Sequence, residues 1–135
     1  MTLVGSPMVV AHSPQQIAVQ GSVAYVTLFD ATQLESIDIS NPASLQAIDT
    51  LSLAAGNQSC HPVPVAVEGS YAYVGCYAEG LIEQVNISNP AQLSLAQRIP
   101  GISSPQRLVF AGNDLLVADG ATGGQVYQID FLSFQ

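Results

Sequence analysis

The chain repeats itself: residues 62–93 are a second copy of residues 14–45, shifted by 48 positions without a gap. The identical positions are Pro14/Pro62, Ala18/Ala66, Val19/Val67, Gly21/Gly69, Ser22/Ser70, Ala24/Ala72, Tyr25/Tyr73, Val26/Val74 and the stretch 39–43 over 87–91. A fainter third copy begins at Pro105 and carries Gly112, Val117 and Ile129. Repeats of about 40 to 50 residues made of short strands and turns are typical of propeller blades.

Each copy predicts short strands joined by turns, with no helix. The expected first strands are 16–19, 63–67 and 106–110, and the second strands are 23–29, 71–77 and 115–118. The third strands end near Ile39, Ile87 and Phe131, and the fourth strands are 45–53 and 93–99. The second strands are nearly continuous in apolar residues, as expected for a sheet that is buried on both faces between two blades.

The fold class predicted from this pattern is an all-β propeller with three four-stranded blades per chain. Blade 1 spans about 14–53, blade 2 about 62–99 and blade 3 about 105–131. The third copy stops where its fourth strand should begin, and a spare strand at 2–10 would fill that place. Propellers typically have about 4 to 8 blades. We therefore expect a homodimer that forms one six-bladed ring, with a trimer or a piece of a longer chain as alternatives.

Composition limits the partners. The chain has 2 basic and 10 acidic residues, a formal net charge of -8, and only 9% charged residues. No basic patch is available for the phosphates of nucleic acid or for an anionic membrane surface. No apolar run approaches the roughly 18 to 20 residues that span a bilayer, and the N-terminus lacks the basic region of a secretory signal. So few charges favour burial of much of the surface, for example by another copy of the chain.

Candidate ligand-binding residues fall on the loops before the first strand and between the second and third strands, which open on one face of a propeller. They are His12, Asp30, His61, Tyr77, Glu79 and Asp119. In a ring of two chains, the histidines would converge at the channel mouth and could bind a divalent metal or an anion. The alternative is that they only hydrogen-bond neighbouring loops. The sequence shows no ligand spacing that is typical of a metal site, so we predict no metal site.

The two cysteines, Cys60 and Cys76, are expected at the same end of the second blade, one before its first strand and one at the end of its second. Neighbouring antiparallel strands bring such ends close enough for a disulfide. Two buried thiols and a zinc site with His61 are the alternatives, although four zinc ligands cannot be assembled from the nearby sequence.

The pattern Val-x-Gly-x-x-Ala-Tyr-Val, followed by Ile-Asp-Ile-Ser-Asn-Pro-Ala, resembles the LVIVD repeat, a propeller repeat of bacterial and archaeal surface or secreted proteins. It is carried by 19–26 with 37–43, and by 67–74 with 85–91. The third copy departs from it, because Leu115-Leu116-Val117 replaces the Ala-Tyr-Val run. The resemblance implies a propeller fold and an extracytoplasmic location. It implies no catalytic residue, since these repeats share none.

The sequence contains no Gly-x-Ser-x-Gly elbow, Walker loop or His-Glu-x-x-His motif. We therefore expect a non-enzymatic binding or interaction module without a cofactor, whose ligand is a small molecule, a carbohydrate or a protein. One alternative is a metal- or carboxylate-dependent hydrolase or lyase that uses Asp30, Glu79 and Asp119 on the loop face. Another is an architectural fragment of a larger surface protein.

Overall fold

The protein is all-β. The computed structural model describes residues 1–10, 13–120 and 124–130. Eleven strands form three antiparallel sheets with the orders β1-β2-β3-β4, β5-β6-β7-β8 and β11-β10-β9. The strands are β1 (Pro14–Gln20), β2 (Val23–Leu28), β3 (Gln33–Asp38), β4 (Gln46–Ser52), β5 (Pro62–Glu68), β6 (Tyr71–Cys76), β7 (Leu81–Asn86), β8 (Ser94–Pro100), β9 (Pro105–Ala111), β10 (Asp114–Asp119) and β11 (Gln125–Asp130). No helix in these ranges is long and apolar enough to cross a membrane.

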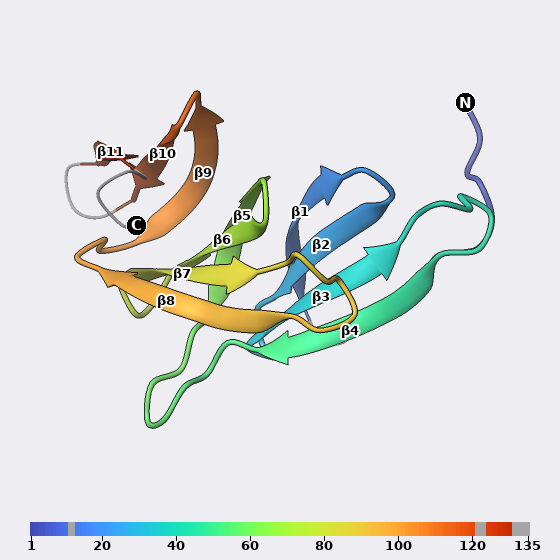
Figure 1. The fold of residues 1–135 in the computed structure, drawn as a ribbon, viewed down its shortest axis with the longest axis horizontal. Coiled ribbons are helices and arrows are strands. Elements are labelled where there is room, and N and C mark those ends of the chain that lie inside the picture. Colours follow the sequence, from blue (N-terminus) through green and yellow to red (C-terminus); the bar gives the residue numbers. More distant parts are fainter. Residues whose placement is uncertain (11–12, 121–123, 131–135) are drawn as a thin grey trace.

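The three sheets stand side by side as successive blades of an arc (Figure 1). Neighbouring blades meet through their first strands, because β5 contacts β1 and β2 on one side and β9 on the other. The strands β4 and β8 form the outer edges of the first two blades. The predicted propeller architecture is thus confirmed, and the described residues supply three strands of the third blade.

Glycine at the first turn of each copy fixes the hairpin between the first and second strands. Gly21, Gly69 and Gly112 have φ angles of 59°, 60° and 64°. This left-handed region is strained for residues that have a Cβ. The three glycines therefore keep β1-β2, β5-β6 and β9-β10 as tight hairpins in the same register.

The Asn-Pro turn closes the third strand in both strong copies through its own side chains. The Asn41 carboxamide oxygen accepts a hydrogen bond from the Ala43 N–H at 3.1 Å, and Asn89 does the same for Ala91 at 3.0 Å. Such local side-chain bonds compete with the sheet ladder, and the following proline has no backbone N–H to donate to that ladder. The motif therefore ends the strand and turns the chain toward the outer strand.

The core lies between blades. One cluster joins blade 1 residues such as Tyr25 and Leu34 to blade 2 residues such as Val74 and Val85, all between 0% and 1% exposed. A second cluster joins blade 2 to blade 3 through Ile82, Leu115 and other apolar side chains. These strands are apolar on both faces because each blade is covered on both sides.

The N-terminal segment differs from the expectation. Residues 1–10 form no strand within the single chain, and they lie at the far end of the arc from blade 3 (Figure 1). A strand needs a hydrogen-bonded neighbour, and blade 3, which has three strands within the described residues, is out of reach. Met8 and Val10 instead pack against the free face of blade 1, on a cluster of Ala24, Val26, Leu28 and Ile37. Completion of a third blade by residues 2–10 stays a prediction.

Candidate functional site

Two of the predicted loop carboxylates tie down the segment that leads into the first strand of their own blade. The Ser13 hydroxyl donates a hydrogen bond to Asp30. Asp119, which is 3% exposed, accepts hydrogen bonds from the Ser103 and Ser104 backbone N–H groups at 3.0 and 2.9 Å. Each carboxylate therefore fixes the loop beside it in the single chain.

Glu79 does the same in blade 2, but its partner is a histidine. One oxygen accepts the His61 backbone N–H at 2.8 Å, and the other lies 2.6 Å from His61 Nδ1 and 3.1 Å from the Ser59 hydroxyl. Burial acts to raise the pKa of Glu79, but these hydrogen bonds from His61 and Ser59 outweigh it and hold the pKa below its usual range. Glu79 is therefore a carboxylate that orients the imidazole.

The orientation of His61 determines what this site can do chemically. Because Glu79 faces Nδ1, the neutral imidazole carries its proton there and presents Nε2 as an acceptor. The Phe29 ring packs against the imidazole with 5.1 Å between centroids, and the His61 side chain is 39% exposed. An imidazole held in this way can accept a proton or serve as one ligand of a metal.

The remaining predicted site residues do not extend this arrangement. The Tyr77 side chain is 39% exposed, and its backbone N–H donates to the His61 carbonyl at 2.9 Å. His12 lies outside the described residues. Over the ranges that the structure describes, the one group of metal-ligating side chains is Cys60, Cys76 and Glu83, and its two sulfurs are bonded to each other. Ligand binding by the six predicted residues stays a prediction.

The predicted disulfide between Cys60 and Cys76 is confirmed. It joins the segment before β5 to the end of β6, with 4.9 Å between the Cα atoms. Both cysteines are fully buried in the cluster between blades 1 and 2. The zinc and free-thiol alternatives are thereby replaced by a cross-link inside blade 2.

A buried ion pair lies beside this disulfide, and it was not predicted from the sequence. Glu83 on β7 and Arg98 on β8 are cross-strand partners, and Arg98 Nη2 lies 2.5 Å from Glu83 Oε1. The guanidinium directs its N–H groups elsewhere, to the Leu53 carbonyl at 2.7 Å and the Gln58 side chain at 2.6 Å. Among the described residues, neither Glu83 oxygen has a hydrogen-bond donor in good geometry. The contact is therefore ionic rather than a well-formed hydrogen bond.

Burial dominates the titration of this carboxyl. Glu83 is 0% exposed, and desolvation raises its pKa from 4.5 to about 7 against the opposing effect of Arg98. The sequence offered one signal for the pair, since one of the two arginines of the chain lies opposite a glutamate in the predicted third and fourth strands.

The comparisons with known proteins match this fold. The LVIVD repeat family matches residues 13–50 and 63–99, which is more than half of the chain. The chain belongs to the LVIVD repeat family. The two matched segments are blades 1 and 2 of the arc, so the propeller predicted from the resemblance is the fold observed. The sequence has no significant match among curated proteins.

Solved propeller structures resemble the LVIVD arc closely in shape and weakly in sequence. A protein from Lactobacillus plantarum matches 95% of the chain with a TM-score of 0.77 and 14% identity. The periplasmic gluconolactonase PpgL of Pseudomonas aeruginosa matches 96% of the chain with a TM-score of 0.75 and 19% identity. BamB of Moraxella catarrhalis matches 88% of the chain with a TM-score of 0.63 and 18% identity. The chain covers 41%, 39% and 34% of these proteins, respectively. At these identities the likeness concerns the fold alone.

Proposed function

We propose that this LVIVD chain is an interaction module whose working form is a propeller ring closed by a second copy. The observation that carries the proposal is that apolar side chains at both ends of the arc are exposed at repeat positions where its internal blades bury them against one another. A binding module is also the function that fits a family without a shared catalytic residue and loop carboxylates that are engaged within their own blades.

The free face of blade 1 corresponds to the face that blade 2 packs against blade 1. Ile17 occupies the repeat position of Val65, and it is 65% exposed where Val65 is 6% exposed. Leu45 occupies the repeat position of Leu93, and it is 37% exposed where Leu93 is 8% exposed. The difference comes from the neighbouring blade, which covers blade 2 and is missing from blade 1.

Blade 3 presents the complementary face. Val109 and Val126 are 50% and 75% exposed. Their counterparts in blade 2, Ala66 and Ile82, are 8% and 0% exposed because they pack against blade 3. The two ends of the arc are therefore apolar surfaces of matching type, and a second copy supplies the partner for each.

The N-terminal segment fits this assembly as the fourth strand of the partner's third blade. Ile99 and Ile102 come shortly before β9 and pack between blades 2 and 3. Met8 and Val10 come shortly before β1 and pack on the free face of blade 1 in the same manner. In a closed ring the partner's third blade lies next to that face, so residues 2–10 lie where its missing outer strand belongs.

Burial of apolar area should drive the closure. Several hundred Å² of apolar surface at each end, at about 25 cal/mol per Å², amounts to on the order of 10 kcal/mol or more. Association opposes this by several kcal/mol, about 4 or more. Burial at both ends together should outweigh this cost, so we expect a stable dimer.

A charge placed on one free face tests the proposal. Ile17→Asp should convert the dimer to a monomer that aggregates readily, because an aspartate would have to be buried at the contact between chains. The matched control is Ala96→Asp on the outer strand β8, where residue 96 is exposed and no contact between chains is expected. The molar mass of each variant is measured by light scattering on a size-exclusion column. A dimeric Ile17→Asp protein would contradict the ring.

A further inference from the structure

A hollow lies at the inner edge of the arc, and none of the predicted loop-face residues lines it. It has a volume of about 400 Å³ and lies among the first strands of the three blades. Its lining residues are Gln15, Gln16, Ile17, Val65, Arg107 and Leu108. The hollow therefore draws on β1, β5 and β9, the strands that face the centre of a propeller ring.

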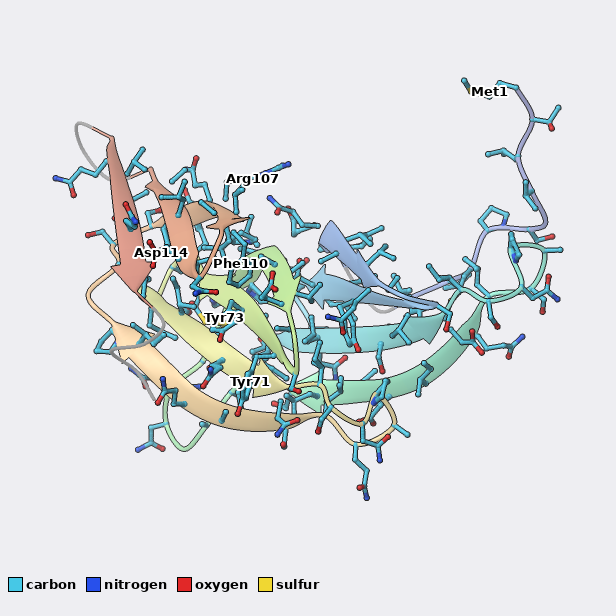
Figure 2. The ribbon with its side chains drawn as sticks, turned by 45° about the horizontal axis from the view of Figure 1, so that its top comes forward. Met1, Tyr71, Tyr73, Arg107, Phe110 and Asp114 are labelled. Carbon is cyan, nitrogen blue, oxygen red and sulfur yellow. A yellow bond between two sulfur atoms is a disulfide. The ribbon has the colours of Figure 1, made fainter. Side chains whose placement is uncertain are left out.

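Arg107 is the charged group of this hollow. Arg98, the other basic side chain of the sequence, is held by Leu53, Gln58 and Glu83. The Arg107 side chain is exposed and has no hydrogen-bond or ion-pair partner within the described part of the chain. Figure 2 shows it extending from the orange third blade into open space. A guanidinium in this setting is available for an anion.

The glutamines supply neutral hydrogen-bonding groups next to it. The Gln16 side chain donates to the Gln106 carbonyl at 3.2 Å, which ties β1 to β9 across the hollow. The Gln15 side chain is exposed at its rim. Amide groups donate and accept at once, so they can bind hydroxyl groups of a ligand. Val65 and Leu108 are buried apolar residues in the lining, and they can contact a short carbon chain.

We propose that this hollow binds a small carboxylate that carries hydroxyl groups. The planar guanidinium of Arg107 matches a carboxylate in a bidentate geometry, and the glutamine amides match the hydroxyls. The proposal gives the interaction module a ligand class and rests on the proposed function to that extent. The formal net charge of -8 does not prevent such binding, because salt screens charges farther than about 8 Å at physiological ionic strength.

Tartrate and threitol are the probes, since they share a four-carbon polyol skeleton and differ in having carboxylates or hydroxymethyl groups at the ends. Titration calorimetry on the intact chain should give tartrate a dissociation constant on the order of 1 mM, which is ordinary for so small a ligand, and threitol no measurable binding. Arg107→Gln should weaken tartrate binding at least about tenfold. Arg107→Lys should weaken it less, because lysine keeps the positive charge but lacks the planar pair of donors that binds a carboxylate bidentately.

The matched control is Gln46→Glu on the outer strand β4, where residue 46 is exposed. It lowers the net charge by one, as Arg107→Gln does, but at the edge of blade 1 away from the hollow. Equal losses in these two variants would overturn the proposal, as would equal binding of tartrate and threitol or no binding of tartrate. The molar mass of the same samples separates the two claims: a monomer that binds tartrate contradicts the ring alone, and a dimer that does not bind contradicts the hollow alone.

Discussion

Arg98→Met is expected to lower the free energy of unfolding by about 3–5 kcal/mol at pH 8, the usual cost of removing one partner of a buried ion pair. At that pH the Glu83 carboxyl is largely ionised, because its pKa is about 7. Arg98 Nη2, 2.5 Å away, is its partner in the interior. The variant leaves a buried carboxylate that must take up a proton or draw in water. Chemical denaturation monitored by circular dichroism measures the loss.

The stability lost in Arg98→Met should be larger at pH 8 than at pH 5. Folding raises the pKa of Glu83, so this group stabilises the folded protein fully below about pH 4.5 and loses that contribution as the pH rises through about 7. The slope is at most about 1.4 kcal/mol per pH unit, so the stabilisation lost as the pH rises from about 4.5 through about 7 should total about 3 kcal/mol. At pH 5 Glu83 is protonated, so Arg98→Met should cost only about 1–2 kcal/mol for the hydrogen bonds to Leu53 and Gln58.

The double variant Glu83→Gln/Arg98→Met is the control. A glutamine cannot ionise, so the loss caused by Arg98→Met in this background should be the same at pH 5 and pH 8. A loss in the original background that is equally independent of pH would show that Glu83 is not the titrating group.

Removing the disulfide is expected to have the next largest effect. Cys60→Ala/Cys76→Ala should lower the free energy of unfolding by about 3 kcal/mol, since the bridge closes a loop of about 15 residues in the unfolded chain. Both sulfurs are fully buried, so the cavities left by the alanines should add to the loss. Urea denaturation of the variant beside the oxidised protein gives the difference.

The single variant Cys76→Ala, kept under reductant, serves as the control because it has no cross-link and keeps one sulfur. Its free energy of unfolding should be close to that of the double variant, from which it differs by one small cavity. A double variant within about 0.5 kcal/mol of the oxidised protein would contradict a stabilising role of the bridge, because surface-like changes have effects of that size.

The parts of the fold that were predictable from sequence are those fixed by local chemistry. Gly21 and Gly69 require positive φ, and the Asn-Pro turns bond to their own backbone, so strand ends are visible without a structure. The disulfide follows from the same register, since paired strand ends place Cys60 beside Cys76. The N-terminal segment was not predictable in this way, because a strand needs a hydrogen-bonded neighbour and residues 1–10 pair with no strand among the described residues.

The site features that were missed depend on packing between blades. Glu83 and Glu35 occupy the same repeat position, but Arg98 faces the first and Thr50 the second. Comparison of the two copies therefore gives no repeated ion-pair signal. Asp30 and Asp119 were expected on the loop face, but their bonds to the segments before β1 and β9 follow from the closeness of the loops, which the sequence pattern does not specify.

The central claim is that two copies of the arc close one ring, and the molar mass of the intact chain in solution tests it most directly. Light scattering at micromolar concentration should give twice the 14.1 kDa of one chain, with no change on dilution over about tenfold, because the buried apolar area predicts tight association. A stable, well-folded monomer would contradict the account, and a mass three times that of the chain would replace six blades by nine.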